Sequence, residues 1–207
     1  MDRSTLATES SPAVAPAPEL ARLQCADAAG WERWLEAEHD RSPGVWLELP
    51  RKAARSTQAC LTYAAALEIA ICFGWIDGQR RPGDDRFWLQ RFTPRGPRSK
   101  WSQVNRDKAT ALIAAGRMRE AGHRQVLAAQ DDGRWEAAYE PQSRATVPED
   151  LQRALEAEPE ALAFFVTLTG VRRYAFLYRL HHVRSPDARA RRIAAYIELL
   201  RDHRILN

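Results

Sequence analysis

LTYAAALEIAICFGWIDG, residues 61 to 78, changes from one hydrophobic period to another within a few positions. Thr62 is a suitable N-cap, and residues 63 to 73 are mostly Ala, Leu and Ile with Glu68 as the only charge, which predicts a helix buried nearly all round. Gly74 stands where a helix that ends usually needs a left-handed residue. From Trp75 the chain has the two-residue period of a strand. This stretch therefore predicts a buried helix that leads directly into a sheet.

The segments around this helix predict the rest of that sheet. WIDGQR and RFWLQRF read as two extended segments joined by the turn RPGDD, residues 81 to 85, so we expect a β-hairpin. GVWLELP, residues 44 to 50, alternates apolar and other side chains, which is typical of a strand with one buried face. Together these segments predict a small antiparallel sheet, one face of which the 63 to 73 helix covers. TPRGPRSK, residues 93 to 100, is too rich in proline for regular structure and predicts a loop.

Further helices are indicated on both sides of the sheet segments. Asp27 is a plausible N-cap for a helix with Trp31, Trp34 and Leu35 on one face. Ser102 is expected to cap a helix through Ala115, and a short helix follows over about 119 to 131. The side chains expected to point inward from the Ser102 helix are Val104, Leu112 and Ile113.

Beyond Gly133 every pattern is helical. Thr146-Val147-Pro148-Glu149 has the form of a capping box, and Pro159 opens another helix that Gly170 ends. A third helix is expected over about 171 to 183, and Ser185-Pro186-Asp187 starts a last one that runs to about 203. We expect the last helix to bury one stripe of residues, Ile193, Tyr196, Ile197 and Leu200.

The predicted fold class is α+β: a small antiparallel sheet covered by helices, followed by an all-helical C-terminal half. Residues 1 to 20 mix Ala, Pro, Ser and Thr without periodicity and predict a disordered leader. Residues 21 to 135 form the expected α+β core domain, and residues 136 to 207 the helical C-terminal region. Whether that region packs into the same core or forms its own stays open at this level.

Composition excludes several classes of protein. The apolar fraction of 45% and the charged fraction of 28% are typical of a soluble globular protein, and no run approaches 18 uncharged apolar residues. We therefore expect a cytoplasmic protein without membrane insertion. Cys25, Cys60 and Cys72 are an odd number without close spacing, and the five histidines are scattered except for one adjacent pair. No metal site and no cofactor is predicted.

Motifs for a reaction are also missing. The sequence has no nucleophile elbow, no phosphate-binding glycine loop and no dinucleotide fingerprint. Cys72 is placed at the end of a buried helix, where both the helix C-terminus and apolar neighbours disfavour a thiolate. Asp77 is a lone carboxylate, and acid–base catalysis usually needs a partner. We predict no catalytic residue and favour a binding protein over an enzyme.

The segment from 73 to 105 carries the hypothesis of a binding site. Four positive side chains, Arg91, Arg95, Arg98 and Lys100, fall within ten residues without a carboxylate among them. If their loop folds back toward the start of the Ser102 helix, guanidinium groups and helical N–H groups would converge on an anion. The residues predicted to bind the ligand are Trp75, Asp77, Arg91, Arg95, Arg98, Lys100, Trp101, Ser102 and Asn105.

Two alternatives to this anion site stay open. The loop is equally compatible with a solvated basic surface whose arginines bond to carbonyl groups or to nearby aspartates. Arginine beside tryptophan also suits nucleic acid, but the net charge of +4 is modest and no nucleic-acid motif is present, which argues against that partner. An anionic small molecule or an acidic protein segment is the expected ligand.

Several segments in order resemble one bacterial family. LTYAAALEIAICFGWIDG, RFTPR, SKWSQVN, DGRW, VPEDLQRAL and ARARRI together are similar to the YdeI/OmpD-associated family, also described as bacteriocin-protection proteins, over about residues 27 to 205. The resemblance implies a cytoplasmic stress protein, tolerance of bacteriocins or cationic antimicrobial peptides, and association with an outer-membrane porin. It implies no catalytic residues. An unrecognised hydrolase or transferase that uses the same cleft is the alternative.

Overall fold

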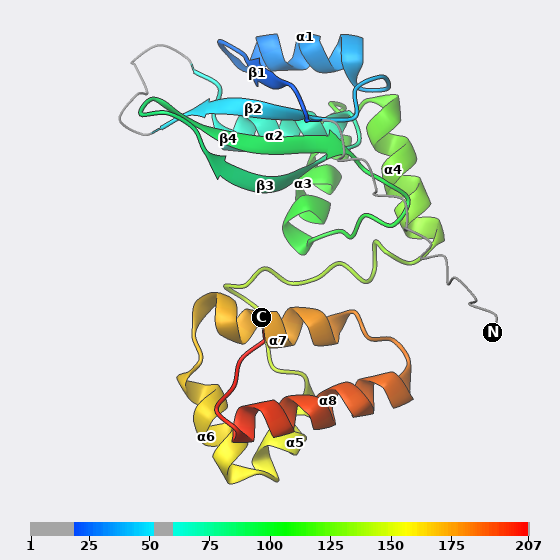
Figure 1. Cartoon of the computed structure of the whole chain (residues 1–207). Helices are drawn as coiled ribbons and strands as arrows, with labels where there is room; N and C mark the ends of the chain where they lie inside the picture. The colour runs from blue at the N-terminus through cyan, green and yellow to red at the C-terminus, as the bar shows by residue number, and fades with distance from the viewer. Residues whose placement is uncertain (1–18, 52–59, 207) are drawn as a thin grey trace, which may run out of the picture.

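The computed structural model describes residues 19–51 and 60–206, so residues 1–18 of the predicted leader lie outside the described residues. The described part of the chain combines one four-stranded sheet with helices, which confirms the α+β class. Figure 1 shows the sheet with its helices as one group and the C-terminal helices as another.

The strand order in the sheet is β1-β2-β4-β3, formed by β1 (Arg22–Gln24), β2 (Val45–Pro50), β4 (Phe87–Pro94) and β3 (Trp75–Pro82). β4 pairs antiparallel with both of its neighbours, so the expected hairpin and the expected strand over 44 to 50 are confirmed. β1 pairs parallel with β2, which makes the sheet mixed rather than wholly antiparallel. A three-residue strand carries too little alternation to be predicted from its own residues.

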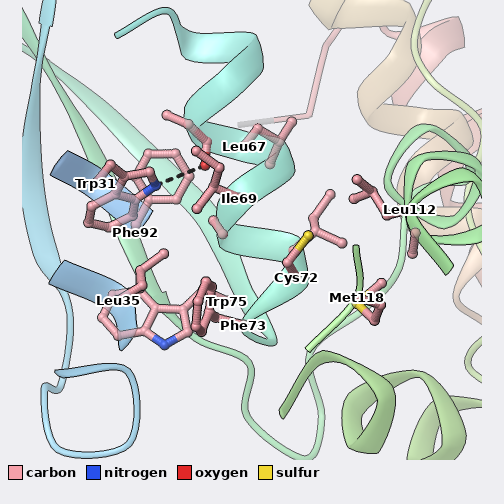
Figure 2. Packing of buried hydrophobic residues seen from close by; sticks show 14 of the residues in the cluster. Trp31, Leu35, Leu67, Ile69, Cys72, Phe73, Trp75, Phe92, Leu112 and Met118 are labelled. Carbon is pink, nitrogen blue, oxygen red and sulfur yellow. Dashed lines mark hydrogen bonds between the residues drawn. The ribbon is translucent and has the colours of Figure 1, made fainter. Parts of the chain in front are cut away.

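The core lies between the sheet and α2 (Tyr63–Cys72), which Figure 1 shows behind the strands. Val45, Leu47 and Leu49 of β2 are buried in this core, and α1 (Ala28–Glu38) adds the buried side chain of Trp31 to it. Trp31 Nε1 donates a hydrogen bond to Ala66 O at 3.0 Å. In Figure 2, Trp31 and Phe92 lie on one side of α2, and Leu112 and Met118 lie on the other. The prediction that this helix is buried nearly all round is confirmed.

Gly74 links α2 to β3 in the left-handed conformation that was expected. Its φ is +73°, and a Cβ atom there would lie 2.8 Å from Ala121 O. The position therefore excludes larger residues both by its backbone angle and by the closeness of the next helix. Thr62 caps α2 as predicted, because its Oγ1 accepts a hydrogen bond from Ala65 N at 3.2 Å.

The buried face of α3 (Gln103–Ala114) differs from the prediction. Asn105, Ala109 and Leu112 are buried, whereas Val104 is 40% exposed and Ile113 is 36% exposed. The prediction that Leu112 points inward is confirmed, and the prediction that Val104 and Ile113 point inward is wrong. The helix has few large apolar residues, so its packing partners decided its rotation. α4 (Glu120–Asp131) follows close to the expected bounds.

The described residues after 148 form α5 (Glu149–Glu156), α6 (Pro159–Thr167), α7 (Gly170–His181) and α8 (Pro186–Arg201). The predicted capping box is wrong, because Pro148 is the N-cap of α5 and makes no side-chain bond. Thr146 instead donates from its backbone N–H to Glu140 Oε2 at 3.1 Å.

Most of the buried apolar residues of the described chain fall into two clusters, and Trp46 and Leu89 belong to neither. The first runs from Trp31 to Ala138 and belongs to the sheet and its helices. The second runs from Leu151 to Leu200 and is formed by α5 to α8. The linker between these clusters, residues 132–148, contacts α3 through the bond from Arg106 Nη1 to Trp135 O and α7 through the bond from Tyr174 Oη to Glu140 O.

Candidate functional site

The loop after β4 is held in place by its own backbone and by the linker. Arg95 N donates to Gly74 O at 3.0 Å, and Gly96 N donates to Ser99 Oγ at 3.0 Å. Arg134 Nη1 donates to Ser99 O at 2.9 Å, which ties the loop to the linker. The linker also pairs with the residues before α3, because Tyr139 N donates to Trp101 O at 3.0 Å. The loop after β4 therefore folds back against the linker and the start of α3.

A hollow of about 400 Å³ lies where this loop, the linker and the end of α7 meet. We call it the basic hollow. Its lining residues are Pro97, Arg98, Lys100, Trp101, Asp132, Arg134, Ala137, His182 and Arg184.

The charges around the basic hollow do not balance. Within the described residues, Arg98, Lys100 and Arg184 form no ion pair with a carboxylate. Arg134 is paired, because its Nε lies 2.7 Å from Asp132 Oδ2. That bond holds the pKa of Asp132 below its usual value, so the one carboxylate on the hollow is already neutralised by Arg134. The excess positive charge favours an anion there.

Two ring nitrogens on the same hollow also lack a partner. Trp101 is 2% exposed, and its Nε1 is buried without a hydrogen-bond partner among the described residues. His182 Nε2 is buried and unpartnered in the same way. The indole N–H of Trp101 is a donor without an acceptor, which costs free energy, so an acceptor atom of a ligand in the hollow would stabilise it; Nε2 of His182 is a donor as well whenever it carries a proton.

Two bases on the hollow, His182 and Lys100, have lowered pKa values. Burial, together with Lys100, His181 and Arg184, lowers the pKa of His182 to about 4. Burial also lowers the pKa of Lys100. Both shifts disfavour further positive charge, and an anion bound between these groups would oppose them.

Arg95 lies against the aromatic wall of the hollow without lining it. Its guanidinium carbon is 3.6 Å from the centroid of the Trp101 ring, and Nη1 donates to Lys100 O at 3.2 Å. The residue is 5% exposed, and its Nε and Nη2 have no partner among the described residues. Burial lowers its pKa to about 10, although Asp77 and Tyr139 act in the opposite direction. Arg95 therefore supports the wall of the site as a buried cation.

Three more of the predicted residues lie on β3 and β4, away from the basic hollow. Trp75 is wholly buried in the first core, where its Nε1 donates to His39 O at 3.0 Å. Asp77 accepts a hydrogen bond from Tyr63 Oη at 2.8 Å. Arg91 lies on the sheet beside Gly78, and its Nε is buried without a partner. None of the three lines the hollow.

Ser102 and Asn105 have local roles at the start of α3. Ser102 Oγ accepts a hydrogen bond from Asn105 N at 3.1 Å, and Gln103 N donates to Tyr139 O at 2.8 Å. Because these two N–H groups are occupied, they do not join the guanidinium groups at an anion, as the sequence had suggested. The structure thus brings together Arg98, Lys100 and Trp101 from the predicted set.

Sequence reasoning missed Arg134, His182 and Arg184. They follow the loop by more than thirty positions and come from the linker and the end of α7. Asp132-Gly133-Arg134-Trp135 follows the end of α4 and His182-Val183-Arg184 the end of α7, and charged residues just after a helix are the signal that could have marked them. No local pattern indicates that both segments meet the loop after β4.

Comparison with known proteins matches two separate parts of the chain. Residues 144–203 match the family model described as "Bacteriocin-protection, YdeI or OmpD-Associated". Residues 23–125 match a model described as "Domain of unknown function (DUF8412)". No curated protein and no solved structure matches the chain. The family resemblance found in the sequence is confirmed for residues 144–203. The basic hollow draws residues from both matched regions and from the linker between them.

Proposed function

We propose that the protein binds an anionic ligand in the basic hollow and that this binding serves a role in bacteriocin protection. The observation that carries the proposal is that Arg98, Lys100 and Arg184, which form no ion pair among the described residues, line one hollow with Trp101, whose Nε1 has no partner. A carboxylate or phosphate group suits this arrangement, because arginine donates in pairs to such oxygens and an indole N–H needs an acceptor.

The biological part of the proposal is supported by the family description of residues 144–203. That description names bacteriocin protection and OmpD, so we include association with an outer-membrane porin and a cytoplasmic stress function in the proposal. No helix within residues 19–51 and 60–206 is both long enough and apolar enough to span a bilayer. Cell fractionation and co-purification with the porin would test location and partner.

The direct test of ligand binding uses sulfate, which stays fully ionised over a wide pH range. We expect sulfate to shift the indole N–H resonance of Trp101 in the NMR spectrum of the full chain, with Trp101→Phe identifying that resonance. Arg98→Ala and Arg184→Ala should each weaken sulfate binding by roughly three- to tenfold, because each removes an exposed charge from the hollow. Arg124→Ala is the matched control, since Arg124 lies on α4 and pairs with Glu120.

The outcomes separate the proposal from its alternatives. A Trp101 resonance that does not respond to sulfate, or equal effects of Arg98→Ala and Arg124→Ala, would contradict it. Single-stranded DNA that binds much more tightly than sulfate, with affinity falling by about 0.7 log units per phosphate contact for each log unit of salt, would instead favour nucleic acid. Native mass spectrometry of freshly purified protein would show any anionic metabolite that remains bound.

A further inference from the structure

A second hollow, of about 360 Å³, adjoins the basic hollow and is lined by aromatic and acidic side chains instead of basic ones. We call it the tyrosine hollow. Ala137 and His182 line the basic hollow, whereas their chain neighbours Ala138 and His181 line the tyrosine hollow. The side chains that define its chemistry are Tyr139, Tyr174, Tyr178, Glu136 and Glu140.

Three aromatic rings form one corner of this hollow. The rings of Tyr139 and Tyr178 are 4.9 Å apart between centroids and meet at 88°. The ring of Tyr174 lies 5.7 Å from that of Tyr178 and is tilted by 44°. In a T-shaped pair the edge of one ring meets the face of the other, and the ring faces that remain free attract a cation.

The charges of the tyrosine hollow support the same ligand. No lysine or arginine is among the described residues that line it, whereas Glu136 is exposed and Glu140 is half-buried. Burial raises the pKa of Tyr174 to about 12, and Tyr139, Tyr178 and Glu140 add to the effect. Burial, the largest cause of that shift, disfavours charge of either sign, so it is the two glutamates on the lining that favour a positive ligand.

The lining groups are held in position before any ligand arrives. Tyr174 Oη donates to Glu140 O at 2.7 Å, and Glu140 Oε2 accepts a hydrogen bond from Thr146 N. Tyr178 already accepts one cation, because Lys100 Nζ lies 5.2 Å from its centroid. The ring faces for a ligand therefore come chiefly from Tyr139 and Tyr174, with Tyr178 fixing the angle between them.

We propose that the tyrosine hollow binds an organic cation, namely the ammonium or guanidinium group of a free amine or of a lysine or arginine side chain. The described residues contain no group of three His, Cys, Asp or Glu side chains that could hold a metal ion. Aromatic faces with two carboxylates at the rim suit a large, weakly hydrated cation instead. This inference does not depend on anion binding in the basic hollow.

The test titrates Nα-acetyl-arginine methylamide into the full chain and follows the tyrosine ring signals by NMR. Nα-acetyl-citrulline methylamide is the matched neutral probe, because it has nearly the same shape without the charge. We expect the arginine probe to shift the signals of Tyr139 and Tyr174 and the citrulline probe to bind at least about fivefold more weakly, as expected for a cation held by ring faces. Equal affinity for the two probes would overturn the proposal.

Variants of the carboxylates and of one ring complete the test. The Glu136→Gln, Glu140→Gln double variant should weaken the arginine probe by roughly fivefold, whereas Glu156→Gln on α5 should not. Tyr174→Leu should abolish the response, and Tyr174→Phe should retain most of it because the ring face remains. If Tyr174→Leu fails to fold, the carboxylate variant decides, and its unchanged affinity would contradict the proposal.

The same experiments identify the source of the cation and keep the two proposals separate. A glycine-rich peptide with one arginine that binds more tightly than the single-residue probe indicates a peptide ligand, and equal affinity indicates a free amine. The carboxylate variant should bind sulfate at the basic hollow at least as well as the wild type does. If the wild type binds sulfate but not the arginine probe, the proposal for the tyrosine hollow fails alone; if it binds the arginine probe but not sulfate, the proposal for the basic hollow fails alone.

Discussion

The guanidinium carbon of Arg95 lies 3.6 Å from the centroid of the Trp101 ring, so a buried positive charge rests directly against the aromatic wall of the basic hollow. Arg95 has no ion pair among the described residues, and two of its donor nitrogens have no partner. A buried charge without an ion pair costs desolvation free energy, and the nearby charge of Asp77 offsets only part of that cost.

Replacing Arg95 with Met tests this cost. Met keeps the length and packing of the stem and removes the charge, so we expect the free energy of unfolding to stay equal or to rise by about 1 kcal/mol. Trp101→Ala, by contrast, should lower it by about 3–5 kcal/mol because it leaves a large cavity. Urea denaturation measures both. A loss of more than about 2 kcal/mol in Arg95→Met would show that the charge is stabilising.

Anion binding at the basic hollow should be accompanied by proton uptake at His182. The pKa of His182 is lowered to about 4 by burial and by the neighbouring cations Lys100, His181 and Arg184. A bound anion opposes those cations and gives Nε2 an acceptor, so the pKa should rise toward its usual value of about 6.5. Sulfate affinity should therefore increase as the pH falls from about 6.5 toward about 4.

Calorimetry of sulfate binding in two buffers with different ionisation enthalpies counts the protons taken up. His182→Gln should remove the proton uptake, and His123→Gln, at an exposed position on α4, should leave it unchanged. The same proton count for wild type and His182→Gln would assign the uptake to another group.

Gly122 and Gly30 both lie in helices, and they should respond in opposite directions to alanine. Helix propensity alone favours alanine by about 1 kcal/mol at each site. At Gly122, however, a Cβ atom would lie 2.4 Å from Cys72 O, which is backbone, whereas at Gly30 the nearest atom is 3.4 Å away. We expect Gly122→Ala to lose about 1–3 kcal/mol of stability through overpacking, and Gly30→Ala to be neutral or stabilising. Denaturant titration of the two variants checks this, and equal effects would contradict the close approach of α4 to the end of α2.

The hydrogen bond from Tyr63 Oη to Asp77 should make stability depend on alkaline pH. Burial, followed by the charge of Asp77 and this hydrogen bond, raises the pKa of Tyr63. Because the folded state holds the phenolic proton more tightly, this stabilisation is complete below pH ~10 and is lost as the pH rises further.

Tyr63→Phe removes both the hydrogen bond and this pH dependence. We expect a loss of about 1–3 kcal/mol at neutral pH, since the acceptor is charged, and a flatter stability curve above pH ~10. Tyr196→Phe is the matched control, because it removes a buried phenol whose Oη has no hydrogen-bond partner among the described residues. If the two variants had the same alkaline stability curve, Tyr63 would not be the group responsible.

The sequence by itself predicted most of the elements, because their signals are local. Thr62 and Gly74 mark the ends of α2 through caps and backbone angles that depend on neighbouring residues only. The alternation of β2 and the turn between β3 and β4 are local in the same sense. The family resemblance of residues 144–203 also needed nothing beyond the order of residues.

Only the tertiary structure decided where the chemistry lies. Arg98 and Arg184 are far apart in the chain and meet because the linker crosses between the two clusters of helices. Trp75 and Trp101 carry the same side chain in one basic segment and are both buried in the first core, yet only Trp101 also lines the basic hollow. The physical reason is that caps, turns and hydrophobic periods act over a few residues, whereas burial and charge balance depend on which distant segments pack together.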